Sequence, residues 1–293
     1  PRFKGNVENV LIYIATEITR IGDAPKDEFN NSLNNAIKCF PGNSTLALKT
    51  VNNWRTEISS LFGLFYEDEN HYNHAMLRAK ELAEHNDLVE FFKLFLYYFQ
   101  YPGAHIKSRD VLEQIEAGIH FKPTQYILKL LKTAEENTGK RCGITKEEAC
   151  YCIFNDLRCT RDNEDVVITW QRIQRNRDLE IEYVADGDVT RYAGDILDYM
   201  QHANLLVSYN NKEFFINHSE NEAILKYINS TEWFSEYDTM IANRSGTIQD
   251  VNDCRCDWFR YVNREAGETD FATDITSFFA VESEIPTEPE SKM

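Results

Sequence analysis

Hydroxyl, amide and amine side chains recur along one face of the segment NSTLALKTVNNWRTEISSLFG, residues 43–63. At 100° per residue this face lies opposite an apolar stripe of Val51, Trp54, Ile58, Leu61 and Phe65, and it carries no acidic residue. Gly63 is expected to end the helix. Asparagine can pair with adenine, threonine can contact a thymine methyl group, and lysine can reach guanine or phosphate. These residue types therefore favour contact with DNA bases, with a solvated helix face as the alternative. The candidates are Thr45, Lys49, Asn52, Asn53, Arg55 and Thr56.

A second helix of similar design is predicted over residues 188–206, followed by a hairpin at Asn210–Asn211. Arginine favours guanine, glutamine pairs with adenine, and a lysine at a hairpin tip suits a phosphate. Asp198 can accept from cytosine, although phosphate repels a carboxylate. The candidates in this region are Thr190, Arg191, Gln201 and Lys212.

Two further groups of polar residues suit a phosphate backbone. The stretch QYPGAHIKSRD has the Pro-Gly punctuation of a loop and reads as a connector between domains. Arg172 and Arg175 share one face of a predicted helix, which indicates either a phosphate clamp or a surface that favours solubility. The connector candidates are Gln100, Tyr101, His105, Lys107, Ser108 and Arg109.

Motifs for catalysis or metal binding are missing from the sequence. It contains no G-x-S-x-G, no phosphate-binding glycine loop, no H-E-x-x-H and no C-x₂-C. The seven cysteines favour reduced, mostly core thiols over a zinc site. His71 and His74 read as a surface pair beside a turn. The segment TDFATDITSFF supplies acids without the lysine that a Mg²⁺-dependent nuclease needs beside them.

The composition is that of an acidic globular protein. Its 293 residues carry a formal charge of −17 with 42% hydrophobic residues, which argues against nonspecific nucleic-acid binding. The cations concentrate in residues 121–180, which hold eleven of the thirty-one lysines and arginines. No apolar run reaches membrane-spanning length, and the N-terminus lacks the pattern of a signal peptide. These features predict a cytoplasmic protein.

Helical periodicity and turn signals predict two modules of similar design. In the first, three helices over residues 6–20, 26–40 and 43–63 precede a hairpin over 64–75, with Asn43 or Ser44 as the cap of the third helix. In the second, Pro123 suits a first helical turn, and Thr145 with Glu148 has the spacing of a capping box. Helices are predicted there over residues 165–179 and 188–206. The second of these buries Tyr192, Ile196, Tyr199, Met200 and Ala203.

Helices followed by a hairpin are the order of a winged helix, whose third helix usually enters a DNA groove. The predicted fold class is mainly α with short β-hairpins (α+β), as two winged-helix subdomains joined by a connector. The aromatic run from Phe91 to Phe99 reads as a buried inter-domain helix. The expected ranges are 1–99 for the first subdomain, 100–122 for the connector, 123–230 for the second subdomain, 231–280 for a packing extension and 281–293 for a linker or tail.

Three phrases carry a resemblance to a known family: ALKTVNNWRTEISSLFGLF, AKELAEHNDLVEFFKLFLYYFQYPG and FKPTQYILKLLKTAEENTGKRCGITKEEA. They resemble the N-terminal recognition region of type IIS restriction endonucleases of the BpuJI kind. The resemblance implies two winged-helix subdomains and a connector that read a short asymmetric site in double-stranded DNA. It also implies a separate nuclease domain that uses Mg²⁺. The chain itself is then expected to be a monomer that binds DNA without cleaving it and needs no cofactor.

Two other functions remain open at this point. Winged helices also mediate protein contacts, and the charge of −17 favours a helical interaction module without DNA specificity. An enzyme complete in itself has the least support. The salt dependence of DNA binding distinguishes DNA recognition from an interaction module. Only DNA recognition predicts tight binding to one short duplex that weakens steeply as ionic strength rises.

Overall fold

The computed structural model describes residues 7–184, 187–210 and 212–264, apart from the side chains at positions 56, 57, 59, 188 and 189. Helices dominate it, and the strands are short, as the sequence predicts. The first module runs from residue 7 to residue 85. Its elements are α1 (Val7–Ile21), β1 (Ala24–Pro25), α2 (Lys26–Cys39), α3 (Leu48–Asn53), a π-helical turn η1 (Trp54–Ile58), α4 (Ser59–Phe62), β2 (Phe65–Glu67), β3 (Tyr72–Ala75) and α5 (Leu77–His85).

Residues 48–62 form one continuous helical stretch, which we call the third helical stretch. It begins later than predicted: Ala47 is the N-cap, while the Asn43 side chain is buried and donates to the Ile37 carbonyl at the end of α2 (2.9 Å). The π-helical turn widens the helix, so the buried position moves from Leu61 to Phe62. The predicted stripe is also wrong at its end, because Phe65 lies in β2.

A three-stranded antiparallel sheet closes the first module in the order β1-β3-β2. The predicted hairpin is confirmed, with Phe65 opposite Ala75 and Glu67 opposite Asn73. Gly63 ends the third helical stretch with a φ of 64°, which glycine adopts without strain. His71 and His74 lie at this hairpin, as predicted. Each imidazole donates to a carboxylate, His71 to Glu67 and His74 to Asp68.

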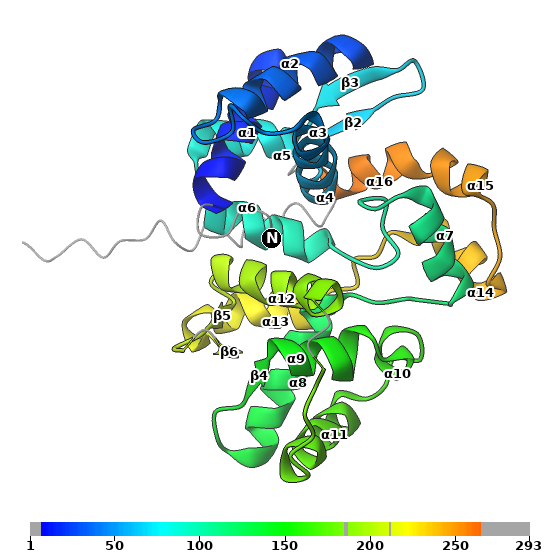
Figure 1. The fold of residues 1–293 in the computed structure, drawn as a ribbon. Coiled ribbons are helices and arrows are strands. Elements are labelled where there is room, and N and C mark those ends of the chain that lie inside the picture. Colours follow the sequence, from blue (N-terminus) through cyan, green and yellow to red (C-terminus); the bar gives the residue numbers. More distant parts are fainter. Residues whose placement is uncertain (1–6, 185–186, 211, 265–293) are drawn as a thin grey trace, which may run out of the picture.

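Helix α6 (Leu88–Tyr98) lies between the two halves of the molecule, and most of its side chains are buried. This confirms the predicted buried helix at the aromatic run. Figure 1 shows α6 with the first module on one side and α12 (Gly187–His202) on the other. The Phe92 ring is parallel to the Tyr199 ring of α12 at a centroid distance of 5.3 Å and makes an edge contact with Phe62 of the third helical stretch. Aromatic packing on α6 therefore ties both halves into one core.

The second module, residues 123–229, repeats the order helix, strand, helices, hairpin. Pro123 occupies the first turn of α8, and Thr145 and Glu148 form both bonds of a capping box, as predicted. Its sheet has the order β4-β6-β5, which matches the first module. The elements other than α12 are α8 (Pro123–Thr138), β4 (Gly143–Thr145), α9 (Lys146–Ala149), the π-helical turn η2 (Cys150–Phe154), α10 (Leu157–Thr160), α11 (Val166–Asp178), β5 (Leu206–Val207), β6 (Glu213–Ile216), η3 (His218–Glu220) and α13 (Asn221–Asn229).

The connector and the chain after residue 230 pack against each other on one side of the molecule (Figure 1). The connector begins and ends at a backbone bridge between Tyr101 and Phe121 and contains α7 (Ser108–Glu116). Helix α7 packs on two helices of the C-terminal extension, so the extension covers part of the connector. The extension contains the 3₁₀ turn η4 (Ser235–Tyr237) and the helices α14 (Asp238–Asn243), α15 (Ile248–Asp253) and α16 (Arg255–Val262).

Two predictions about buried residues have different outcomes. The four cysteines from Cys142 to Cys159 are buried free thiols, which confirms their assignment to the core. On α12, the predicted burial of Ile196, Tyr199, Met200 and Ala203 is confirmed. The prediction for Tyr192 is wrong, because α12 turns Ala193 into the core and leaves Tyr192 60% exposed. Within the ranges that the structure describes, no helix is both long and apolar enough to cross a membrane.

Candidate nucleic-acid interface

Three side chains form a compact cluster between α2 and the third helical stretch. Arg55 Nη1 donates to Asn34 Oδ1 at 2.9 Å and to Asn52 Oδ1 at 3.3 Å, and Asn34 Nδ2 donates to Asn52 Oδ1 at 3.2 Å. We call Asn34, Asn52 and Arg55 the amide–arginine cluster. All three side chains are half-buried. The third helical stretch supplies two of them and α2 the third, so the fold assembles the cluster from positions 18 or more residues apart.

The guanidinium of Arg55 has no acidic partner among the described residues. Burial lowers the pKa of Arg55 from its ordinary value. Arginine stays protonated at neutral pH even so. Among the described side chains, amide oxygens alone accept from this positive charge, which suits an electron-rich ligand.

The other predicted contacts of this module lie around the cluster. Lys49 is exposed on the third helical stretch, and Asn53 is half-buried there. Thr45 is exposed but precedes the helix, because the helix begins at Leu48. The side chain of Thr56 lies outside the described residues. Asn34 escaped prediction, although the run FNNSLNNAIK, with four asparagines on α2, was a visible signal.

Helix α12 presents a different surface. Lys146 Nζ lies 2.6 Å from Asp198 Oδ1. Asp198 is therefore paired within the protein and is not available to accept from a cytosine. The Arg191 guanidinium lies over the exposed Tyr192 ring, 4.9 Å from its centroid. Gln201 is half-buried. Thr190 is a weak candidate, because its Oγ1 is buried and has no hydrogen-bond partner among the described residues.

Two connector candidates are wrong because the structure places their side chains in the interior. Gln100 is fully buried; its Oε1 accepts from the Phe234 backbone N–H (2.8 Å) and its Nε2 donates to the Phe234 carbonyl. His105 lies among the rings of Phe99, Tyr101 and Trp258, and burial lowers its pKa to about 3. Both residues hold the connector to the C-terminal extension.

The remaining connector candidates lie closer to solvent. Tyr101 is half-buried, and burial raises the pKa of its hydroxyl above the ordinary value, so its ring serves packing rather than contact. Lys107 is exposed at the start of α7. Ser108 donates to the Asn252 side chain of α15. Arg109 is exposed and pairs with Glu113 one helical turn away (3.3 Å). Lys107 and Arg109 remain available for phosphate contact.

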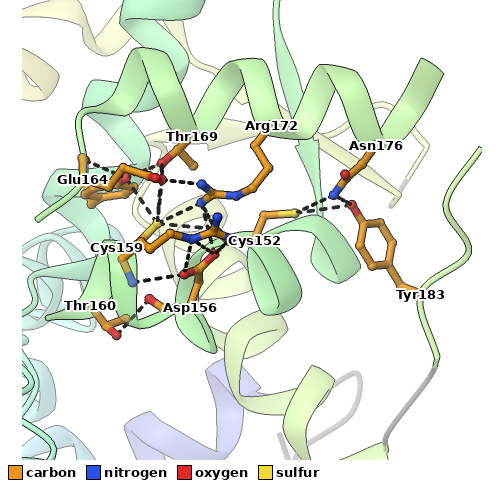
Figure 2. A network of polar contacts seen from close by, with 11 residues as sticks. Cys152, Asp156, Cys159, Thr160, Glu164, Thr169, Arg172, Asn176 and Tyr183 are labelled. Atoms are coloured by element: carbon orange, nitrogen blue, oxygen red, sulfur yellow. Dashed lines mark hydrogen bonds and ion pairs between the residues drawn. The ribbon is translucent and has the colours of Figure 1, made fainter. Parts of the chain in front are cut away.

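Arg172 is the clearest wrong assignment, since it belongs to a largely buried polar network (Figure 2). Its Nη1 lies 2.5 Å from Glu164 Oε2, and its Nη2 lies 3.2 Å from Asp156 and donates to the Cys152 carbonyl. This guanidinium is therefore already paired with two carboxylates and a carbonyl inside the protein. Its contacts connect α11 to η2 and to the start of α10. Of the proposed clamp, only Arg175 is exposed.

The second hairpin carries an exposed cation–aromatic group. Arg141 donates to the Tyr209 hydroxyl (2.7 Å) and to the Ile216 carbonyl (3.0 Å), and its guanidinium lies over the Tyr209 ring. Tyr209 is 74% exposed, and Lys212 is exposed beside it. Arg141 escaped prediction, because only the sheet brings residue 141 to the hairpin. Asn211 of the predicted turn lies outside the described residues.

Metal-binding groups do not gather in the part of the chain that the structure describes. There, no three histidine, cysteine or acidic side chains come together in a way that could hold a metal ion. The residues present therefore do not fit a Mg²⁺ site. The segment TDFATDITSFF lies outside the described residues.

The comparisons with known proteins agree on one family. The sequence matches the family described as "Restriction endonuclease BpuJI - N terminal" over residues 1–259. No curated protein matches it. A similar solved structure is described as "Crystal structure of pyrene- and phenanthrene-modified DNA in complex with the BpuJ1 endonuclease binding domain". It has 26% sequence identity and a TM-score of 0.75, and the likeness covers 88% of this chain and 93% of that one. The chain belongs to the family of the N-terminal region of the restriction endonuclease BpuJI.

Proposed function

We propose that the chain recognises a specific sequence in double-stranded DNA as the target-recognition part of a restriction endonuclease. The observation that carries the proposal is the family match over residues 1–259, together with the likeness of almost the whole chain to a binding domain solved with DNA. The amide–arginine cluster and exposed Lys49 supply a surface that suits DNA despite the charge of −17.

In this proposal both modules are winged helices that approach the major groove. The repeated order of helices and hairpin, and the matching strand orders of the two sheets, support it. The cations at Lys107 of the connector and at Arg141 and Lys212 of the second hairpin suit phosphates.

The resemblance to type IIS enzymes also implies the kind of site, the oligomeric state and the place of cleavage. The recognised site is short and asymmetric, and the chain binds it as a monomer in the cytoplasm. Cleavage belongs to a separate nuclease domain with its own Mg²⁺, because the described residues offer no such site. The chain alone then binds DNA and does not cut it.

Selection of duplexes from a random pool tests this function. The chain should retain one short sequence, and its affinity should fall steeply between about 50 and 200 mM salt. Lys49→Ala should weaken all sequences alike and reduce the salt slope by about 1. Lys129→Ala, at an exposed lysine of α8, is the matched control and should change neither. Retention of no sequence above background would refute the proposal.

A protein-interaction module is the second candidate, and one observation favours it. Large apolar side chains are exposed on α11 and just after it: Ile168 (53%), Leu179 (59%) and Ile181 (48%). Large exposed apolar side chains mark a protein contact where they form one patch. This function predicts no preferred duplex in the same selection.

A further inference from the structure

Arg55 leaves one edge of its guanidinium available for a ligand. Its two contacts, to Asn34 and Asn52, both use Nη1, which has two hydrogens to donate. Its Nε and Nη2 donate to no described residue. These two nitrogens form a planar fork that matches two acceptors side by side. The cluster therefore holds the guanidinium by one end and offers the other.

The charge of Arg55 is compensated differently from that of other arginines in this chain. Arg177 pairs with Glu148 at 2.6 Å, and Arg172 pairs with Glu164. Buried Arg78 donates to the carbonyls of Phe62 and Val262, where two helices end. Among the described side chains, Arg55 contacts only two amide oxygens, and removing an unpaired charge from water is costly. Its compensating partner is therefore expected to come from outside the protein.

The backbone around Arg55 also departs from a regular helix. Arg55 lies in the π-helical turn Trp54–Ile58, and this turn packs against α2. Single π-helical turns are rare and are often found at functional sites. Here the turn coincides with the residue whose side chain crosses to Asn34. The irregular turn therefore lies where Arg55 contacts Asn34 of α2.

We propose that the Nε–Nη2 edge of Arg55 reads a guanine in the major groove, with Asn34 as the residue that positions it. The proposal rests on the function proposed above. Guanine presents O6 and N7 as two adjacent acceptors, and a bidentate arginine is the commonest specific contact to them. A phosphate offers similar acceptors. Arg55, however, is half-buried and held by Asn34, which suits a base at a fixed position. Lys49 is exposed, which suits a phosphate of the DNA backbone.

Asn34 acts through Arg55 rather than on the base. Its Oδ1 accepts from Arg55, and its Nδ2 holds Asn52, so both amide oxygens turn toward the guanidinium. Because arginine only donates, any acceptor at this position can restrain it. Asn34→Ala removes the restraint, whereas Asn34→Asp keeps an acceptor and cancels the positive charge.

The test measures base preference at every position of the selected duplex. Arg55→Ala should lower the preference for guanine at one position by about 10- to 100-fold and leave the other positions unchanged. Arg55→Lys should also lose most of the preference for guanine, because an ammonium group cannot donate to O6 and N7 from a planar fork. Asn34→Ala should reduce the same preference by about tenfold. Asn34→Asp should keep the preference while weakening all sequences alike. Thermal unfolding of each variant checks the fold.

Three outcomes would count against this assignment. If Arg55→Ala weakened every sequence equally and kept the base preferences, Arg55 would contact phosphate. If the lost preference were for adenine, thymine or cytosine, the ligand assignment would be wrong. If Asn34→Ala and Asn34→Asp altered the guanine preference equally, Asn34 would not act as a positioning acceptor. A wild-type chain that retains no sequence refutes the proposed function instead.

Discussion

The third helical stretch of the first module and α12 of the second occupy the same place in the order of elements, yet they present opposite surfaces. In the first, Arg55 has no carboxylate partner within the described part of the chain, and Lys49 is exposed. The second pairs Asp198 with Lys146 and packs one side against α6. A repeated order of elements therefore does not imply a repeated role. The charges that stay available for a ligand depend on which neighbours have already neutralised them.

The two helices also meet at α6, which makes each dependent on the other. The third helical stretch reaches α6 through Phe62, and α12 reaches it through Tyr199 and His202. Substitutions at this junction and at the charged groups of the two helices therefore test how far the helices differ.

Removal of the Phe92 ring, which contacts both helices, should have the largest effect on stability. Phe92 is fully buried and contacts both helices, so Phe92→Ala should lower the free energy of unfolding by about 3–5 kcal/mol. Denaturant unfolding followed by circular dichroism measures it. Tyr192→Ala is the control on α12, since that side chain is 60% exposed, and it should change stability by less than about 0.5 kcal/mol. Equal small losses would show that α6 does not hold α12.

Release of Lys146 of α9 from its ion pair with Asp198 of α12 should have a moderate effect on duplex affinity. Asp198→Asn leaves Lys146 without its carboxylate, so duplex affinity should rise about threefold at low salt and the salt slope should steepen by about 1. Asp178→Asn makes the same change of net charge at the end of α11 and serves as the control. Equal gains in both variants would indicate that α12 does not face DNA.

Titration of two histidines should have the smallest effect and opposite signs in the two modules. Burial lowers the pKa of His202 on α12, although Glu8 and Asp198 oppose the shift. The unfolded chain then binds more protons, so this contribution to stability is lost as pH falls below about 6.5. The pKa of His74 is raised: desolvation opposes the rise, but hydrogen bonds to Asp68 and Asp23 outweigh it. Its contribution is present below about 6.5 and lost as pH rises through the folded pKa.

Melting temperatures between about pH 5 and pH 8 measure both signs. His202→Gln should be less sensitive than the wild type to acid, and His74→Gln should lose stability mainly at the acid end. His85→Gln, at an exposed histidine of α5, is the surface control. If both variants moved in the same direction at pH 5, the contrast between the modules would not extend to their histidines.

Local sequence signals determined most of the secondary structure. Periodicity placed the helices, Pro123, Gly63 and the Thr145–Glu148 box marked helix ends, and the aromatic run predicted buried α6. These signals succeed because a cap or an apolar stripe involves residues within one or two turns. The acid-free face of residues 43–63 was equally readable, because helical geometry alone separates its sides.

Only the tertiary structure decided which polar groups remain for a ligand. Gln100 bonds Phe234, 134 positions along the chain, Arg172 meets Glu164 and Asp156 in a buried network, and Asn34 joins Arg55 across two helices. No local pattern encodes such partners, because folding brings them together from distant positions. Helix-forming tendency is a short-range property, whereas the availability of a charge depends on every group that packs around it.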